Sequence, residues 1–159
     1  MARPLSPTPR HAALDEISKR IIEELQTDGR KPYAAVGKAV GLSEAAVRQR
    51  VQRLQESGVI QIVAVTDPVQ VGFTRQAMLG VRTESDVLVI ADRISALEGV
   101  DYVVVTTGTY DLLVEVYAEN DESLLHLINN GVRAIDGVIS TETFVYLRLH
   151  KQLYNWGTR

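Results

Sequence analysis

The first third of the chain repeats apolar residues with the period of an α-helix. Five of them recur mostly three or four positions apart: Leu14, Ile17, Ile21, Ile22 and Leu25. Charged residues fall between them, so the pattern predicts an amphipathic helix that ends near Asp28 and Gly29. A shorter apolar stripe at Val36, Ala39 and Val40 predicts a second helix of about two turns.

Proline, glycine and serine residues mark the ends of these elements and predict a third helix. Pro32 suits the opening turn of the second helix, and Gly41 ends it. Ser43 is a favourable N-cap for a helix over about residues 44–57, which Gly58 closes. Two helices joined by a tight glycine-containing turn predict a helix-turn-helix domain of the winged-helix-like kind.

Beyond the third helix the pattern changes to short strands and helices. Residues 59–65 are rich in β-branched residues, which predicts a strand. Asp67-Pro68 and Gly72 mark a turn, so we expect a β linker over residues 61–75. Six segments follow, expected as strand, helix, strand, strand, helix and strand: residues 76–83, 87–97, 100–107, 110–118, 124–135 and 139–149. The order βαββαβ is that of a ferredoxin-like two-layer sandwich, which makes the expected fold class α+β.

The two middle strands of this sandwich carry apolar residues on both faces. One alternates Tyr110, Leu112, Val114 and Val116 with Leu113 and Tyr117, and the other alternates Val100, Tyr102 and Val104 with Val103 and Val105. The helices of this fold cover only one face of the sheet, so the other face of a monomer should be polar. We therefore expect another copy of the protein to cover the second face.

The net charge of the 159-residue chain is −3, but its two parts differ in sign. Residues 1–60 hold ten Lys and Arg residues against seven acidic ones, whereas the remainder holds seven against thirteen. A basic N-terminal part favours a polyanionic partner such as double-stranded DNA.

Five segments follow from these patterns. Three Pro residues within residues 4–9 break any regular element and predict a flexible arm that carries Arg3 and Arg10. An arm that contacts DNA and a simple disordered tail both agree with this composition. The expected segments are the arm at 1–13, the helix-turn-helix domain at 14–60, the β linker at 61–75, the effector-binding and oligomerisation domain at 76–152 and a C-terminal tail at 153–159.

Composition and motifs exclude several classes of function. The chain contains no Cys, which excludes disulfides, thiolate metal sites and a Cys nucleophile. No apolar run approaches the roughly 20 residues of a membrane span, and the N-terminus lacks the apolar region of a signal peptide, so we expect a cytoplasmic protein. His11, His126 and His150 lie in three different predicted elements, and the motifs HExxH, GxGxxG, GxSxG and the P-loop are absent. We expect no metal, no cofactor and no catalytic residues.

The third predicted helix has an apolar back and a polar front. Val47, Val51 and Leu54 share the back. On the front, Arg can bridge the acceptors of guanine, Gln can pair with adenine, and a small residue near the N-terminus lets the helix approach the base edges. We assign to DNA contact Ser43, Glu44, Ala45, Arg48, Gln49, Arg50, Gln52 and Arg53. Arg50 lies nearer the core edge, where an internal ion pair or a phosphate contact is an equally good assignment. The alternative for the whole set is a solvated helix surface.

Several short motifs at fixed spacings resemble those of one family. They are Leu14-Asp15, Asp28-Gly29-Arg30, Gly41-Leu42-Ser43 and Val47-x-x-Arg50-Val51-x-Arg53-Leu54-x-x-x-Gly58-Val59-Ile60. Together they resemble the Lrp/AsnC family of feast/famine regulators. The sequence Gly108-Thr109-Tyr110-Asp111 is similar to the Gly-x-Tyr-Asp turn of that family's effector-binding domain. The resemblance implies a dimer built on the βαββαβ domains, assembly to octamers or similar, and amino-acid effectors bound between subunits.

Two places depart from the pattern of that family. Ser18 stands where a second Asp is common in the first helix, and Ile62-Val63 replaces a commoner Gly-aromatic pair after the third helix. Neither place lies on the predicted DNA-reading face. The departures therefore concern only the geometry of the hinge between the domains.

The turn also suits a free amino acid on chemical grounds. Gly108 permits close approach of a ligand to the backbone, successive N–H groups of a turn can hold a carboxylate, and Asp111 can accept from an ammonium. Thr141 and Thr143 can add hydroxyl contacts, although β-propensity also explains threonine in a strand. The expected effector site is Gly108, Thr109, Tyr110, Asp111, Thr141 and Thr143. The alternative is an ordinary hairpin turn with an exposed Asp.

Three functions agree with these patterns. The leading hypothesis is a sequence-specific DNA-binding transcriptional regulator whose assembly or DNA affinity responds to a small effector. Tetrapyrrole decarboxylases of the sirohaem type resemble the same two-domain family, but they would need functional His and Arg residues in the C-terminal half, where His126, His150 and a few Arg residues are available. An architectural DNA-binding protein without an effector would share every N-terminal feature and differ only at the Gly108 turn.

Overall fold

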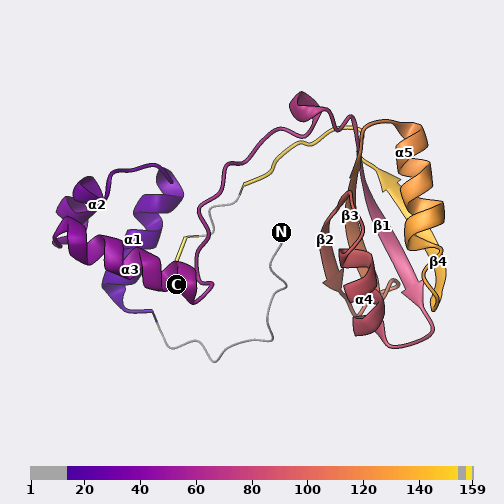
Figure 1. Ribbon diagram of the computed structural model, residues 1–159, viewed down its shortest axis with the longest axis horizontal. Helices are drawn as coiled ribbons and strands as arrows, with labels where there is room; N and C mark the ends of the chain where they lie inside the picture. Colours follow the sequence, from indigo (N-terminus) through magenta and orange to yellow (C-terminus); the bar gives the residue numbers. More distant parts are fainter. Residues whose placement is uncertain (1–13, 154–156, 159) are drawn as a thin grey trace. The chain divides into compact units, whose positions relative to one another are not determined.

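The computed structural model describes residues 14–153, 157 and 158 (Figure 1) and separates into two units. The first unit comprises Met1–Ala64 with Lys151–Arg159, and the second comprises Val65–His150. Each unit has its own apolar core. The predicted arm at residues 1–13 and part of the predicted C-terminal tail lie outside the described residues.

Three helices form the first unit, which confirms the helix-turn-helix prediction. They are α1 (Glu16–Thr27), α2 (Tyr33–Val40) and α3 (Glu44–Glu56). The carboxylate of Asp15 caps α1 by accepting a hydrogen bond from the N–H of Ser18 at 2.7 Å. The hydroxyl of Ser43 caps α3 in the same way, accepting from the N–H of Ala46 at 3.2 Å. Each cap satisfies one of the backbone donors that a helix N-terminus leaves free.

Apolar side chains from all three helices meet in the core of this unit. The buried members are Ile21, Leu25, Val36, Val40, Val47 and Val51. Ala39, which the sequence pattern assigned to the apolar stripe of α2, is exposed. A helix of only two turns directs a narrow face to the core, and Val36 and Val40 already fill it. Gly41 has a φ of 79°, and this left-handed conformation ends α2 and turns the chain toward α3.

The segment between the units contains no strand before Arg75, contrary to the predicted β linker at 61–75. A single short turn of 3-10 helix, η1 (Val69–Val71), interrupts it. β-Branched composition favours a strand only where a neighbouring strand pairs with the backbone, and the described chain supplies none here. Val63 and Val65 consequently remain exposed.

The second unit has the predicted βαββαβ order. Its elements are β1 (Arg75–Thr83), α4 (Val87–Ser95), β2 (Val100–Val105), β3 (Leu112–Ala118), α5 (Asp121–His126), the π-helix η2 (Leu127–Val132) and β4 (Val138–Val145). The strands form one sheet in the order β2-β3-β1-β4, and every neighbouring pair is antiparallel. This arrangement confirms the α+β fold class. No helix in the described part of the chain is long and apolar enough to cross a membrane.

Both helices of the second unit lie on the same face of the sheet (Figure 1). Between helices and sheet lies a core that includes Leu79, Val81, Ile90, Ile94, Leu112, Val114, Val116 and Val132. The uncovered face, here called the open face, carries the alternate residues of each strand: Gln76, Met78, Gly80, Arg82, Tyr102, Val104, Leu113, Glu115, Tyr117, Ser140, Glu142 and Phe144. Tyr102 and Phe144 on this face are exposed large hydrophobic residues. As the sequence predicts, apolar side chains lie on this face too, here among polar ones such as Gln76, Arg82 and Glu115.

A β-bulge makes the alternation of side chains along β2 differ from the predicted one. The register of β2 against β3 shifts between Val100 and Tyr102, so Asp101 is an extra residue on this strand. The sequence pattern placed Val100 and Tyr102 on one face. The bulge separates them, and Val100 packs against the helix-covered core together with Val103.

Several elements are shorter than predicted at one end. β2 and β3 leave residues 106–111 to the turn between them, and α4 ends at Ser95. β4 ends at Val145 because its partner β1 begins at Arg75, and its last ladder contact is the N–H of Tyr146 donating to the carbonyl of Gln76 at 2.9 Å. The helix predicted over residues 124–135 begins earlier, at Asp121, changes from α to π at Leu127 and ends at Val132.

Gly80, in the middle of β1, makes room for an aromatic ring on the open face. A Cβ atom at this position would lie 2.6 Å from the ring of Tyr110. That ring meets the ring of Phe144 edge to face, with centroids 6.2 Å apart, and its hydroxyl donates to the carboxylate of Glu142. The missing side chain of Gly80 thus allows a residue of the β2–β3 turn to lie directly on the sheet.

We expect Gly80→Ala to lower the free energy of unfolding by roughly 1–3 kcal/mol, because the added methyl group displaces the Tyr110 ring. In a Tyr110→Ala background the same substitution should be neutral or stabilising, since alanine restricts the unfolded chain and meets no ring. Urea unfolding of the four proteins measures both effects. An equal loss in the two backgrounds would contradict the proposed contact.

Candidate nucleic-acid interface and effector turn

The outer face of α3 presents a continuous polar surface. Val47, Val51 and Leu54 are buried on its inner face. Seven of the eight residues assigned to DNA contact are exposed: Ser43, Glu44, Ala45, Arg48, Gln49, Gln52 and Arg53. The eighth, Arg50, is half-buried. The geometry therefore gathers the assigned residues on one accessible side of one helix.

Two neighbours orient Arg48 on this surface. Its Nη2 donates to Glu44 Oε1 at 2.8 Å, and its guanidinium carbon lies 5.4 Å from the centroid of the Tyr33 ring. The Arg48 side chain is nevertheless 64% exposed, so this ion pair adds only about 0–1 kcal/mol to stability. Its main effect is on conformation, because an oriented guanidinium loses less rotamer freedom when it binds a ligand.

Arg50 forms an internal ion pair, which the sequence had offered as an alternative to a base or phosphate contact. Its Nη1 donates to Asp15 Oδ2 at 2.7 Å and to Ser18 Oγ at 3.1 Å. The hydrogen bond from Arg50, with those from Ser18, lowers the pKa of the Asp15 carboxyl to about 2. Arg50 thereby ties α3 to the start of α1. Ser18, one of the departures from the resembled family, is buried and takes part in this contact.

The turn between β2 and β3 is held by hydrogen bonds to both of its sides. The N–H of Thr106 donates to the carbonyl of Asp111 at 2.8 Å, and the Thr106 hydroxyl donates to the carbonyl of Tyr110. The N–H of Asp111 donates to the carbonyl of Val81 at 2.9 Å, while its Oδ2 accepts from the N–H of Thr83 at 2.7 Å. Asp111 therefore fastens the turn to the end of β1.

The tip of this turn offers unused hydrogen-bonding groups. Gly108 and Thr109 are exposed, and no acceptor among the described residues takes a hydrogen bond from their N–H groups. A Cβ atom on Gly108 would meet nothing within 4 Å, and its φ is not positive, so neither packing nor backbone strain requires glycine here. Asp111 Oδ1 also accepts nothing from the described part of the chain. Two donors and one anionic acceptor thus remain available.

The six residues of the expected effector site do not all lie together. Tyr110 lies over Gly80 on the open face. Thr141 and Thr143 pair with buried residues of β1, which places their side chains on the opposite, helix-covered face. Thr141 Oγ1 accepts there from Arg133 Nε at 2.7 Å. The structure therefore gathers residues 108–111 and separates the two threonines from them.

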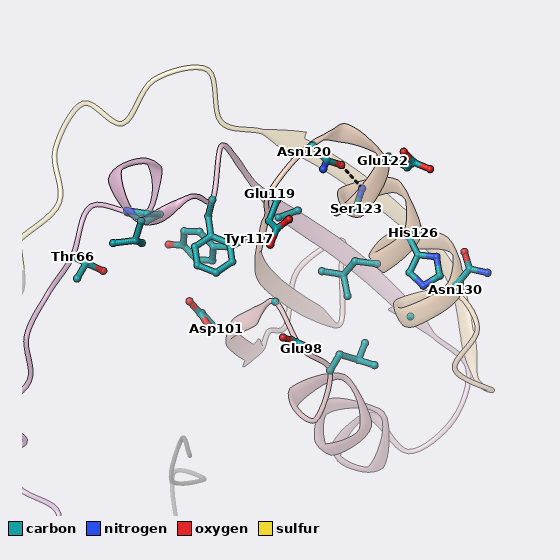
Figure 2. Close-up of a pocket in the computed structure, with 18 residues that line it drawn as sticks. Thr66, Glu98, Asp101, Tyr117, Glu119, Asn120, Glu122, Ser123, His126 and Asn130 are labelled. Carbon is teal, nitrogen blue, oxygen red and sulfur yellow. Dashed lines mark hydrogen bonds between the residues drawn. The ribbon is translucent and has the colours of Figure 1, made fainter.

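A groove of about 1000 Å³ lies at the other end of the sheet from this turn (Figure 2). Residues from η1, the start of β2, the end of β3 and the α5–η2 helix line it. The lining includes four carboxylates and His126, but neither Lys nor Arg. No group of three or more His, Cys, Asp or Glu side chains within the described residues is arranged to hold a metal ion. No local pattern in the sequence indicates this groove, because four elements distant along the chain form its walls.

Both units match models of known protein families. Residues 14–55 match the AsnC-type helix-turn-helix domain, and residues 76–156 match the Lrp/AsnC ligand binding domain. The HTH-type transcriptional regulator FL11 of Pyrococcus furiosus is 35% identical over 141 residues, which cover 87% of this chain and 93% of FL11. LysM of Sulfurisphaera tokodaii, also an HTH-type transcriptional regulator, is 32% identical over 138 residues, which cover 87% of this chain and 98% of LysM.

Two solved structures share the same fold along nearly the whole chain. AsnC of E. coli is 26% identical and has a TM-score of 0.77, with 89% of this chain and 97% of AsnC covered. The transcriptional regulator NMB0573 of Neisseria meningitidis, solved as an L-Met complex, is 22% identical and also has a TM-score of 0.77. That alignment covers 88% of this chain and 94% of NMB0573.

Proposed function

The chain belongs to the Lrp/AsnC family of transcriptional regulators, and from that premise we propose which of its residues read DNA and which hold the effector. Like its relatives, it is a DNA-binding regulator with a ligand-binding domain. In our proposal the exposed face of α3 contacts the base edges of an operator. The turn between β2 and β3 holds a free amino acid between subunits of a homo-oligomer, and this ligand changes assembly or DNA affinity.

The family assignment leaves the two alternative functions without support. The relatives are transcriptional regulators rather than decarboxylases. The match of residues 76–156 to a ligand binding domain favours an effector-responsive regulator over an architectural protein without an effector. A regulator of this kind acts where the chromosome lies, so we propose that the protein works in the cytoplasm.

The orientation of Arg48 is the observation that carries the DNA-reading proposal. Its guanidinium is exposed, is positioned by Glu44 and Tyr33, and lies one residue from the exposed amide of Gln49. Arg and Gln are the side chains that bridge the major-groove edges of guanine and adenine. Ala45, one turn earlier, keeps the N-terminal end of α3 slim enough to enter the groove. We exclude Arg50 from the base-reading set because it is half-buried and its Nη1 already donates to Asp15 and Ser18.

The open face supports a dimer as the operator-binding unit. Apart from the Tyr110 ring, which lies against Phe144, no element among the described residues covers its apolar residues, such as Met78 and Leu113. A second copy that covers them also brings a second helix-turn-helix unit, and two-fold related units read half-sites separated by whole helical turns, about 10 bp or its multiples. Further assembly of such dimers, to an octamer or similar, belongs to the same proposal.

The unused groups of the β2–β3 turn support an amino-acid effector. The free N–H groups of Gly108 and Thr109 suit a carboxylate, and the free oxygen of Asp111 suits an ammonium. NMB0573, which has this fold, was solved as an L-Met complex, and this supports our proposal of the same ligand class here. The proposed site comprises residues 108–111 and leaves out Thr141 and Thr143, which lie on the other face of the sheet.

For DNA reading, we expect Arg48→Ala and Gln49→Ala each to lower the discrimination between operator and random DNA by roughly 1–3 kcal/mol. Arg50→Ala should instead lower the melting temperature, because it breaks the contact between α3 and α1. Fluorescence anisotropy with both duplexes measures the discrimination, and Arg93→Ala in α4 is a matched control with an exposed Arg. Wild-type affinities and footprints in both α3 variants would show that this helix is not the reader.

For effector binding, Asp111→Asn keeps an oxygen acceptor for the N–H of Thr83 while removing the charge, and Gly108→Val fills the space beside the free donors. We expect each change to raise the effector dissociation constant by roughly tenfold or more, because a charge-assisted hydrogen bond or the approach to the donors is lost. DNA affinity without effector should stay nearly unchanged.

A thermal-shift screen of the twenty amino acids identifies the ligand, and calorimetry then compares the variants. Asp92→Asn, an exposed carboxylate on α4, is the matched control. If an amino acid binds and both turn variants retain its wild-type dissociation constant, the effector site lies elsewhere.

A further inference from the structure

A short segment after β4 exposes large apolar side chains without a covering partner. Leu147 is 97% exposed and Leu149 is 54% exposed. Residues 147–150 form neither helix nor strand, and in Figure 1 they follow an open trace away from the end of β4. Arg148 and His150 alternate with the two leucines in the sequence, so the leucines share one side wherever this segment pairs in an extended form.

The charge on this segment is also unpaired. Arg148 forms no ion pair or hydrogen bond with any described residue of the chain. A single exposed leucine is common on protein surfaces. Two exposed leucines that flank an unpaired guanidinium suit a binding partner that is both apolar and negatively charged. A groove with an apolar floor and negatively charged walls is such a partner.

The groove of Figure 2 has those properties. Its lining includes Val71 and Phe73, which are 54% and 40% exposed, and Leu97 and Leu127, which are partly buried against the core. Its carboxylates are those of Glu98, Asp101, Glu119 and Glu122. None of these carboxylates accepts a hydrogen bond or forms an ion pair with the described residues.

We propose that the groove of one protomer receives residues 147–150 of a second copy. The leucines cover Val71 and Phe73, and the guanidinium of Arg148 meets the carboxylates of Glu98 and Asp101. Within one protomer the segment begins at β4, on the edge of the sheet opposite β2, where the N–H of Tyr146 is bonded to the carbonyl of Gln76. Two-fold symmetry lets each copy fill the groove of the other, which closes the assembly. This contact is separate from the effector turn and adds to any contact through the open face.

Site-specific cross-linking of the full chain tests the proposal, because the protein has no native Cys. His150→Cys marks the segment and Asn130→Cys marks the groove without removing a leucine, Arg148 or a carboxylate. Mixing these two tagged variants with a short bismaleimide should give a cross-linked heterodimer in several-fold higher yield than mixing Asn130→Cys with Asp92→Cys on α4. Equal yields in the two mixtures would overturn the proposal.

Charge reversal gives an independent readout. We expect Arg148→Glu to raise the dissociation constant of the assembly by roughly 5- to 10-fold, as measured by sedimentation. Adding Glu98→Lys to the same chain should restore most of the loss, because each groove then meets a reversed segment. Arg93→Glu on α4 is the control and should have no effect. The proposal fails if Arg148→Glu leaves the dissociation constant unchanged or if Glu98→Lys does not restore it.

Discussion

The sheet of the second unit is covered by helices on one face only, and this one-sided burial determines how the domain can assemble. Leu79 and its neighbours are buried under the helices, whereas Met78 and Leu113 lie on the open face. Tyr110 covers part of that face by lying over Gly80. We propose that a second copy of the chain covers the rest of the open face. Because Tyr110 belongs to the β2–β3 turn as well as to the open face, the proposed effector site and the proposed subunit contact share a residue.

The proposed effector site uses groups that also hold the fold together. Asp111 fastens the turn to the end of β1 through Thr83, next to a shift in the register between β1 and β4. A ligand ammonium at the free oxygen of Asp111 would compete for the charge that now holds Thr83. Effector binding can therefore alter the edge of the sheet without a large movement. Such a ligand shifts the assembly only as far as its affinities for two arrangements differ.

Sequence patterns predicted the elements whose signals are local, and they failed where a contact from a distant segment decides the structure. Helical spacing and caps such as Ser43 located all three helices of the first unit. The bulge at Asp101 and the unpaired linker depend on neighbouring strands, which composition does not reveal. The ion pair of Arg50 with Asp15 joins residues 35 positions apart. The sequence therefore indicated that Arg50 could form an internal ion pair but did not identify its partner. The acidic groove, assembled from four elements, left no signal in any single one.

Reciprocal titration tests most directly whether effector and operator act on one assembly. Calorimetry gives the dissociation constant of the amino acid in the absence and in the presence of saturating operator DNA. Linkage requires this constant to change by the same factor as the operator dissociation constant changes when the amino acid is saturating, roughly 5- to 150-fold for an ordinary coupling. An amino acid that binds equally well with and without operator would contradict the view that the turn between β2 and β3 controls DNA binding.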